Sequence, residues 1–221
     1  MNKSKPELLN TNTKVIVFAL LMLISFFSIF LTYNLLFIKK TNINFFQEDI
    51  YLFFYFITLF FLFFFLFNSE YNFSSIFLSL SSSISNIGFS LDESPQNLSF
   101  IYLILVIIGG SFFSTSSGIR FLKIYALFKF AINDLISHVR PKNIFLNTNF
   151  FLKINFQKVE IDKYFLSVLI FIISMFFLSS FLTFSGISLE NSFKLSILTL
   201  MNTVNSSMYG IEYFNFQELQ F

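Results

Sequence analysis

The sequence predicts an all-α integral membrane protein, in which helices that cross the membrane alternate with short helices that enter it without crossing. Two observations support this fold class. The chain is 55% hydrophobic and 12% charged, with a mean hydropathy of +0.74, a composition that excludes a soluble globular domain. Uncharged segments rich in serine lie between the apolar runs, and polar backbone at membrane depth is stable only inside protein or beside a water-filled cavity.

Composition also excludes several kinds of function. The chain has no cysteine, so disulfides, thiolate metal sites and cysteine catalysis are ruled out. A net charge of +2 is too small to indicate nucleic-acid binding, and the single histidine, His138, has no second ligand at metal-binding spacing. Since no motif joins a nucleophile to a base, we expect neither enzyme activity nor a bound cofactor.

The N-terminal half of the chain predicts two spans and one short helix. Residues 15–38 are an uncharged run of 24 residues, long enough for one tilted helix across a hydrocarbon core about 30 Å thick. Residues 50–68, nearly all Phe, Leu and Tyr, form the second span. Residues 73–89 stay uncharged but become rich in serine. They predict a re-entrant helix that ends in a tight turn with its carbonyls available to an ion.

The C-terminal half begins with an interrupted helix. An apolar run starts near Leu98 and breaks at Gly109-Gly110, about halfway across the membrane at 1.5 Å per residue. Helical character resumes over residues 119–137. After a polar, basic loop, residues 164–189 form a further span, and residues 192–201 form a second short helix.

The charge distribution orients these elements. With the loops after residues 38 and 119 in the cytoplasm, that side carries ten Lys and Arg and five acidic residues, whereas the opposite side carries four Lys and seven acidic residues. This arrangement satisfies the positive-inside rule. It also places Glu70, Asp92, Glu93 and Glu190 beside the two short helices, where they would concentrate cations at an outer mouth.

Both short helices are followed by a candidate ion filter. A shift of 117 residues places Ile84-Ser85-Asn86-Ile87-Gly88 on Met201-Asn202-Thr203-Val204-Asn205. Gly88 permits the positive φ that a sharp turn requires, and Asn205, at the equivalent position, is the non-glycine residue that tolerates it best. The alternative is a serine-rich helix that only packs against its neighbours. The predicted filter residues are Ser85, Asn86, Ile87, Gly88, Asn202, Thr203, Val204 and Asn205.

The helix break is a candidate gate. Three glycines and five hydroxyl residues in the middle of a span favour an unwound loop in the ion path, although close packing of small residues would explain them equally well. Arg120 follows the loop, and its guanidinium would face a cavity or partner, or else extend to the inner surface. The predicted gating residues are Gly109, Gly110, Ser111, Ser114, Thr115, Ser116, Gly118 and Arg120.

Several motifs together resemble the TrkH/KtrB family of bacterial potassium uptake proteins, over nearly the whole chain. The most distinctive is Gly109-Gly110-x3-Ser114-Thr115-Ser116-x-Gly118-Ile119-Arg120. The others, in order around it, are Asn34-Leu-Leu-Phe37 through Phe45-Phe-Gln-Glu-Asp, the Ile87-Gly88-Phe89 turn, Ile-Ser-His-Val-Arg140-Pro141, and the span and short helix before Asn202.

The resemblance implies the potassium-channel-like architecture, with four repeats of span, pore helix, filter and span in one chain. This chain would hold about one and a half of the four. Residues 1–49 would contain the last helix of repeat two and a cytoplasmic linker, residues 50–138 repeat three, residues 139–160 a cytoplasmic loop, and residues 161–221 the first part of repeat four.

The resemblance also implies a function and partners. The expected function is potassium uptake across the bacterial inner membrane, with K+ as the transported ion rather than a cofactor. The expected partners are membrane lipid, a second copy of the complete protein in a homodimer, and a cytoplasmic nucleotide-binding regulator of the TrkA/KtrA type. The alternatives are a secondary transporter built from broken helices, or a nonfunctional membrane fragment.

The chain departs from the family pattern in several places. Phe112-Phe113 replace small polar residues in the loop, Arg120 stands where the family usually has Lys, and Asn205 stands where the fourth filter normally has Gly. The first two filters and the final inner helix are also missing, and half a ring cannot enclose an ion. We therefore expect a fragment of a longer gene product, or a subunit that is completed by another polypeptide.

Overall fold

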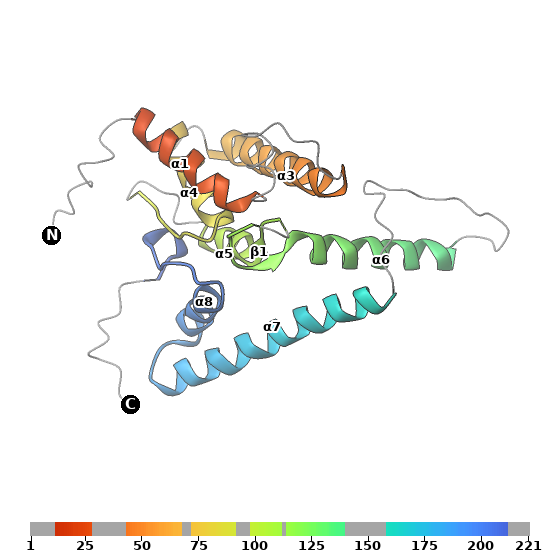
Figure 1. Ribbon diagram of the computed structural model, residues 1–221. Coiled ribbons are helices and arrows are strands. Elements are labelled where there is room, and N and C mark those ends of the chain that lie inside the picture. Colours follow the sequence, from red (N-terminus) through yellow and green to blue (C-terminus); the bar gives the residue numbers. More distant parts are fainter. Residues whose placement is uncertain are drawn as a thin grey trace.

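The computed structural model describes residues 12–27, 43–67, 72–91, 98–111, 114–139 and 158–211. Most of these residues are helical, and Figure 1 shows their arrangement. Two two-residue strands interrupt the helices and pair in parallel, β1 (Ile108–Gly109) and β2 (Ile119–Arg120). The helices are α1 (Asn12–Phe26), α3 (Ile43–Phe67), α4 (Phe73–Ile84), α5 (Ser99–Ile107), α6 (Phe121–Val139), α7 (Lys158–Phe184) and α8 (Leu189–Leu200), followed by the short 3-10 helix η3 (Ser207–Tyr209).

Among the described residues, two helices are long and apolar enough to cross a membrane. They contain the windows Glu48–Leu66 and Val159–Phe184, with mean hydropathies of 2.2 and 2.5. Both lie where the sequence predicts a span, but α3 begins at residue 43 rather than 50, because the charges that end an apolar run do not end a helix. The prediction that α7 extends to residue 189 is wrong. Gly186, with φ +90°, ends the helix through a Schellman-type turn.

The two predicted short helices are present and have equal length. Helices α4 and α8 each contain 12 residues, or about 18 Å at 1.5 Å per residue, which is too short to cross a membrane. Helix α8 begins at Leu189, three residues before the predicted start. The first predicted span is described only over α1, since residues 28–42 lie outside the described residues. The same holds for residues 140–157, most of the predicted cytoplasmic loop.

The predicted interruption of the third apolar run is also present. Helix α5 ends at Ile107, and helix α6 begins only at Phe121, so the chain is not helical at Gly109 and Gly110. Helix α6 starts two residues later than predicted because Ile119 and Arg120 pair with β1 instead of joining the helix. The loop between the two helices therefore begins at β1 and ends at β2, which lie side by side.

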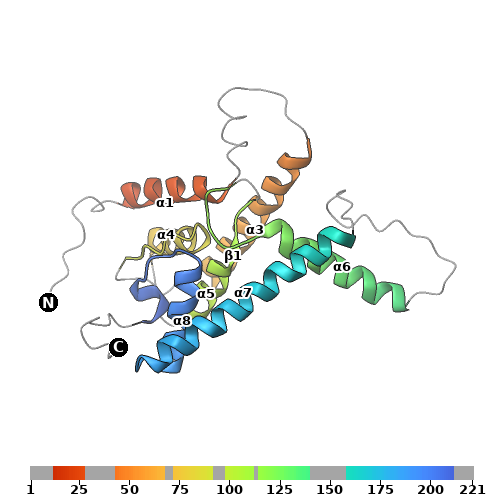
Figure 2. The same ribbon diagram turned by 60° about the horizontal axis from the view of Figure 1, so that its bottom comes forward.

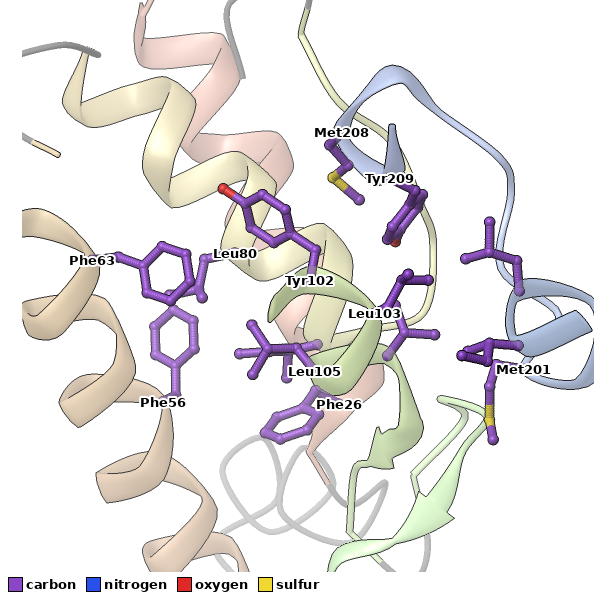
Figure 3. Close-up of a cluster of buried hydrophobic side chains, with 14 of the residues drawn as sticks. Phe26, Phe56, Phe63, Leu80, Tyr102, Leu103, Leu105, Met201, Met208 and Tyr209 are labelled. Atoms are coloured by element: carbon purple, nitrogen blue, oxygen red, sulfur yellow. The ribbon is translucent and has the colours of Figure 1, made fainter. Parts of the chain in front are cut away.

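A single apolar cluster joins most of the helices. Figure 3 shows Tyr102 of α5 near Phe63 of α3, with ring centroids 5.8 Å apart, and Tyr209 of η3 near Leu103. Phe26, at the end of α1, closes the cluster below α5 and is fully buried. This cluster holds α4 against α3 and α5, and a smaller cluster of Val15, Ala19, Met22 and Leu78 holds it against α1.

Helix α7 lies outside this cluster for most of its length. Figures 1 and 2 both show it extending past α6 with α8 against its C-terminal half, and α7 contacts both helices. Only 11% of its apolar window is buried, and rings such as Phe177 and Phe181 are exposed. A surface of this kind is stable only in apolar surroundings, which supports the assignment of α7 as a span.

Candidate functional site

The first candidate filter turn is the C-terminal cap of α4. Ser85 ends the helix, and Asn86 follows with φ +61°. The amide of Asn86 donates to the Ser83 carbonyl at 3.2 Å, and the amide of Ile87 donates to the Ser82 carbonyl at 3.1 Å. These two bonds define a Schellman motif, whose left-handed position favours Gly or Asn. Asn86 therefore supplies the reversal that directs Ile87 and Gly88 away from the helix.

The second candidate turn repeats this cap at α8. Asn202 has φ +49°, its amide donates to the Thr199 carbonyl at 3.2 Å, and the Thr203 amide donates to the Leu198 carbonyl at 2.9 Å. The donor and acceptor of each bond lie 116 residues after those of the corresponding bond at α4. The predicted shift of 117 residues is therefore wrong by one position. The predicted positive φ at Asn205 is also wrong, because the left-handed residue of this turn is Asn202.

The 116-residue relation extends beyond the turns. Moved by 116 residues, Phe73 and Ile84, which bound α4, fall on the first and last residues of α8. The pair Phe60 and Phe77, with ring centroids 5.5 Å apart, falls on Phe176 and Phe193, whose centroids are 6.3 Å apart. One ring contact between the span and the short helix is thus repeated in both halves.

The two turns lie in direct contact. The Val204 amide donates to the Ile87 carbonyl at 3.3 Å. A Cβ added at Gly88, which has φ +79°, would lie 2.1 Å from the Val204 carbonyl oxygen. Glycine is therefore required at this position both by the backbone conformation and by the neighbouring turn, and the predicted positive φ at Gly88 is confirmed.

The predicted filter residues differ in exposure. Ser85, Asn86 and Thr203 are buried, whereas Ile87 and Val204 expose their side chains. Asn205 is partly buried, and its Oδ1 has no hydrogen-bond partner among the described residues. The structure thus brings residues 85–88 and 202–205 together as one site.

Polar groups also line the buried part of α4. Its serines at positions 74, 75, 79, 81, 82 and 83 are all buried. The Oγ atoms of Ser79, Ser81 and Ser82 have no hydrogen-bond partner among the described residues. Buried hydroxyls normally have a partner, so this side of α4 is suited to water or to further polar groups.

The predicted gating loop docks on the end of α1. The amides of Ser111 and Ser116 donate at 3.1 Å to the carbonyls of Phe26 and Ser25, in the last turn of α1. Thr115 Oγ1 donates to the Ser25 carbonyl at 3.4 Å. A Cβ added at Gly110 would lie 2.2 Å from the Phe26 carbonyl oxygen, so only glycine permits this close contact. No sequence pattern indicates that the loop binds these two α1 carbonyls.

Arg120 stabilises the loop from within. Its Nη1 lies 3.0 Å from the Ser114 carbonyl, 2.8 Å from Ser114 Oγ, and 3.1 Å from the carbonyls of Ser111 and Ser116. The sequence left open whether the guanidinium faces a cavity or partner or extends to the inner surface. In the structure it binds a partner, the loop itself. Ser111, Ser114 and Ser116 are buried, and this one cation contacts the carbonyls of all three.

The neck of the loop also contacts the second turn. Gly118 lies against Gly109, because a Cβ added at Gly118 would be 2.8 Å from the Gly109 Cα. Beside this neck, Ser117 Oγ donates to the carbonyl of Met201, the residue that ends α8. Ser117 was not among the predicted site residues, although it lies between two of them.

This arrangement of helices was compared with proteins of known sequence and structure. The structure aligns with the crystal structure of the potassium transporter TrkH from Vibrio parahaemolyticus with a TM-score of 0.74, over 87% of this chain. The chain has the fold of TrkH. Sequence identity is 18%, so the likeness is one of fold, and the chain spans 44% of the TrkH chain. No family model and no curated protein sequence matches.

Within the TrkH fold of this chain, one acidic residue is stabilised at the start of α8. Lys194 Nζ lies 2.7 Å from the Glu190 carboxylate and hydrogen-bonds to it, which lowers the pKa of Glu190 below its ordinary value. A negative charge in the first turn also interacts favourably with the helix dipole. No group of three or more His, Asp or Glu residues able to hold a metal ion occurs in the described part of the chain.

The half of the TrkH fold built from α7 and α8 contains a pocket of about 310 Å³. It is lined by Phe176, Ser179, Ser180, Thr183, Phe184, Leu189 and Phe193. The 116-residue relation places Phe63 and Phe64 on Ser179 and Ser180. The pocket is therefore lined by serines at two positions where the α3 and α4 half carries phenyl rings.

Proposed function

We propose that this chain is part of the pore subunit of a bacterial potassium uptake protein. The observation that carries the proposal is the meeting of two helix ends. Helices α4 and α8 both end in a Schellman turn, and the two turns are joined by the bond from Val204 to Ile87. The C-terminus of a helix carries a partial negative charge of roughly half an electron, so two such ends at one site attract a cation.

The two turns have the features of an ion filter. Their sharp reversals at Asn86 and Asn202 let the chain leave each helix in a non-helical conformation, in which the carbonyls that follow are not used by the helix. Weakly polarised carbonyl oxygens suit a large monovalent cation, because they replace its water ligands without binding it too tightly. In this proposal residues 85–88 and 202–205 are two of the filter segments, and K+ is the transported ion.

The loop between Gly109 and Gly118 is the proposed gate. It is held at one side by the carbonyls of Ser25 and Phe26, and at its neck by the carbonyl of Met201 next to the second turn. A segment held by a few hydrogen bonds rather than by helical structure can be displaced at small free-energy cost. Its displacement would open or close the path beneath the filter.

Further protein completes the proposed pore. The chain spans 44% of TrkH, and its two filter turns alone cannot surround an ion. The remaining segments come from a longer gene product or from another polypeptide. We place the assembly in the bacterial inner membrane, in contact with lipid, as a homodimer that binds a cytoplasmic nucleotide-binding regulator.

Uptake of Rb+ into potassium-uptake-deficient bacteria tests this function. Cells would carry the gene product that contains this chain, unchanged or as Gly88→Val, Gly186→Val or a deletion of residues 111–116. We expect Gly88→Val to abolish uptake without preventing membrane insertion, and Gly186→Val, which also has a positive φ but open space around it, to retain it. The deletion should give constitutive conduction with near-normal ion preference.

Two results would contradict the proposal. Retention of uptake and selectivity in Gly88→Val would exclude the turn as a filter. A deletion that changes selectivity but leaves gating intact would show that the loop supports the filter and is not the gate.

A further inference from the structure

One backbone hydrogen bond is replaced at the break between α5 and α6. In a continuous helix the Val106 carbonyl would accept from the Gly110 amide four residues later. Instead, Asn86 Nδ2 donates to the Val106 carbonyl at 2.7 Å, and the Gly110 amide donates to Ser116 Oγ at 2.9 Å. Two side chains thus take the places of the two backbone groups, and both bonds are buried.

Asn86 has two separate roles in this arrangement. Its backbone forms the left-handed position of the α4 turn, a role that Asn202 fills in the α8 turn. Only Asn86 buries its side chain and donates to the broken helix, whereas the Asn202 side chain is exposed. The bond to Val106 satisfies the buried Nδ2 of this carboxamide, whereas its Oδ1 has no hydrogen-bond partner among the described residues.

We propose that Asn86 is a positioning residue for the loop between Gly109 and Gly118. By occupying the Val106 carbonyl, its carboxamide favours the broken helix over a continuous one and links the first filter turn to the loop. Its effect on the loop stands on these contacts alone. Only the consequence, that a change at the filter turn alters gating, rests on the proposed function.

Hydrogen exchange of the loop amides tests the link without measuring transport. The full chain in detergent would be compared with Asn86→Gly and Asn86→Asp, which both remove the donor and both tolerate a positive φ. Asn202→Gly is the matched control, because it makes the same backbone change at the equivalent position. Exchange would be followed in the peptide covering residues 108–120, with α7 peptides as an internal reference.

The two Asn86 variants should exchange roughly tenfold faster over residues 108–120, since the loss of one buried hydrogen bond leaves the Val106 carbonyl without its partner. Asn202→Gly should leave this peptide unchanged. Unchanged exchange in both Asn86 variants would overturn the inference. Equal acceleration in Asn202→Gly would also overturn it, because the effect would then be general loosening of the fold.

Rb+ uptake by the same variants separates this inference from the proposed function. If Asn86→Gly accelerates loop exchange and also changes the open fraction of the pore, the positioning role of Asn86 and the proposed function are both supported. If the unaltered protein takes up no Rb+, the proposed function fails, yet the exchange measurement still decides whether Asn86 positions the loop.

Discussion

Single residues with a positive φ set the geometry of the candidate filter. Asn86 and Asn202 reverse the chain after their helices, and Gly88 then passes within contact distance of the other turn. In the two asparagines the left-handed conformation is supported by the same pair of backbone hydrogen bonds. Gly88 has a different requirement, since it must also leave room for the Val204 carbonyl.

Replacing Gly88 by alanine should therefore destabilise the chain more than replacing Gly186. Both glycines have a positive φ, so both variants lose about 1–2 kcal/mol to backbone strain. Only the Cβ at position 88 would also collide with a neighbour, which adds about 1–3 kcal/mol. Thermal unfolding in detergent measures the difference. Equal losses in the two variants would show that the two turns are not in contact.

Arg120 supports a second prediction at this scale. Arg120→Lys keeps the charge but loses the planar guanidinium that reaches the Ser114 and Ser116 carbonyls together. We expect it to lower the free energy of unfolding by about 1–2 kcal/mol, and Arg120→Ala by about 2–4 kcal/mol. Lys123→Ala, one turn into α6, is the control and should change it by less than about 0.5 kcal/mol. An Arg120→Ala effect no larger than the control would exclude the contacts described for the guanidinium.

The residue-scale predictions show what a sequence can indicate about a turn. The need for glycine at position 88 could be predicted, because its residue type alone suggests a positive φ. The partner position could not, since pairing Gly88 with Asn205 matched residue preferences rather than hydrogen bonds. The hydrogen bonds of the two helix caps show that Asn86 is equivalent to Asn202. Nothing in the sequence distinguishes a shift of 116 residues between the two halves from a shift of 117.

At the scale of helices, the two halves share a backbone but differ in their side chains. Helices α4 and α8 have the same length and cap, and each shares one equivalent ring pair with the preceding span. The replacement of Phe63 and Phe64 by Ser179 and Ser180 leaves a pocket in the second half. The backbone arrangement thus tolerates the loss of two rings, because caps and the Phe176 and Phe193 pair still hold α8 in place.

Filling this pocket should stabilise the second half. Ser180→Phe introduces the residue that stands at the equivalent position 64, and the pocket of about 310 Å³ is larger than the roughly 150 Å³ that accommodates benzene. We expect a gain of about 1 kcal/mol in the free energy of unfolding in detergent. Ser174→Phe is the control, because both hydroxyls donate to the carbonyl four residues earlier but only Ser180 lines the pocket. No gain over Ser174→Phe would mean that the pocket is already filled.

The helices themselves could be predicted more fully than their ends. Long apolar runs indicate α3 and α7, and serine-rich runs between them indicate the short helices. The observed helix boundaries differ from the predicted ones where a local interaction decides them, as at Gly186 and at the pairing of Ile119 with Ile108. Contacts between distant segments, such as the loop with the α1 carbonyls, leave no pattern in a single sequence.

For the whole molecule, the orientation in the membrane is the main prediction that the structure leaves open. The chain has no cysteine, so a single introduced cysteine reports one position without background. Asn72 and His138 are both exposed and lie on opposite sides of the predicted membrane. A cysteine at position 138 should react only from the cytoplasm, and one at position 72 only from outside. The reverse pattern would invert the orientation and place the candidate filter on the inner side.

The hydrogen bonds around the helix break have a thermodynamic consequence for the whole molecule. The Val106 carbonyl and the Gly110 amide each have one partner in the broken helix, and in a continuous helix each would have one partner in the other. Rejoining the helix would form one hydrogen bond between these two groups and break two, leaving Asn86 Nδ2 and Ser116 Oγ without these partners, so the hydrogen bonds favour the broken helix. An ion, regulator or lipid that prefers the continuous helix by about 1.4 kcal/mol would offset this preference and change the ratio of the two populations tenfold.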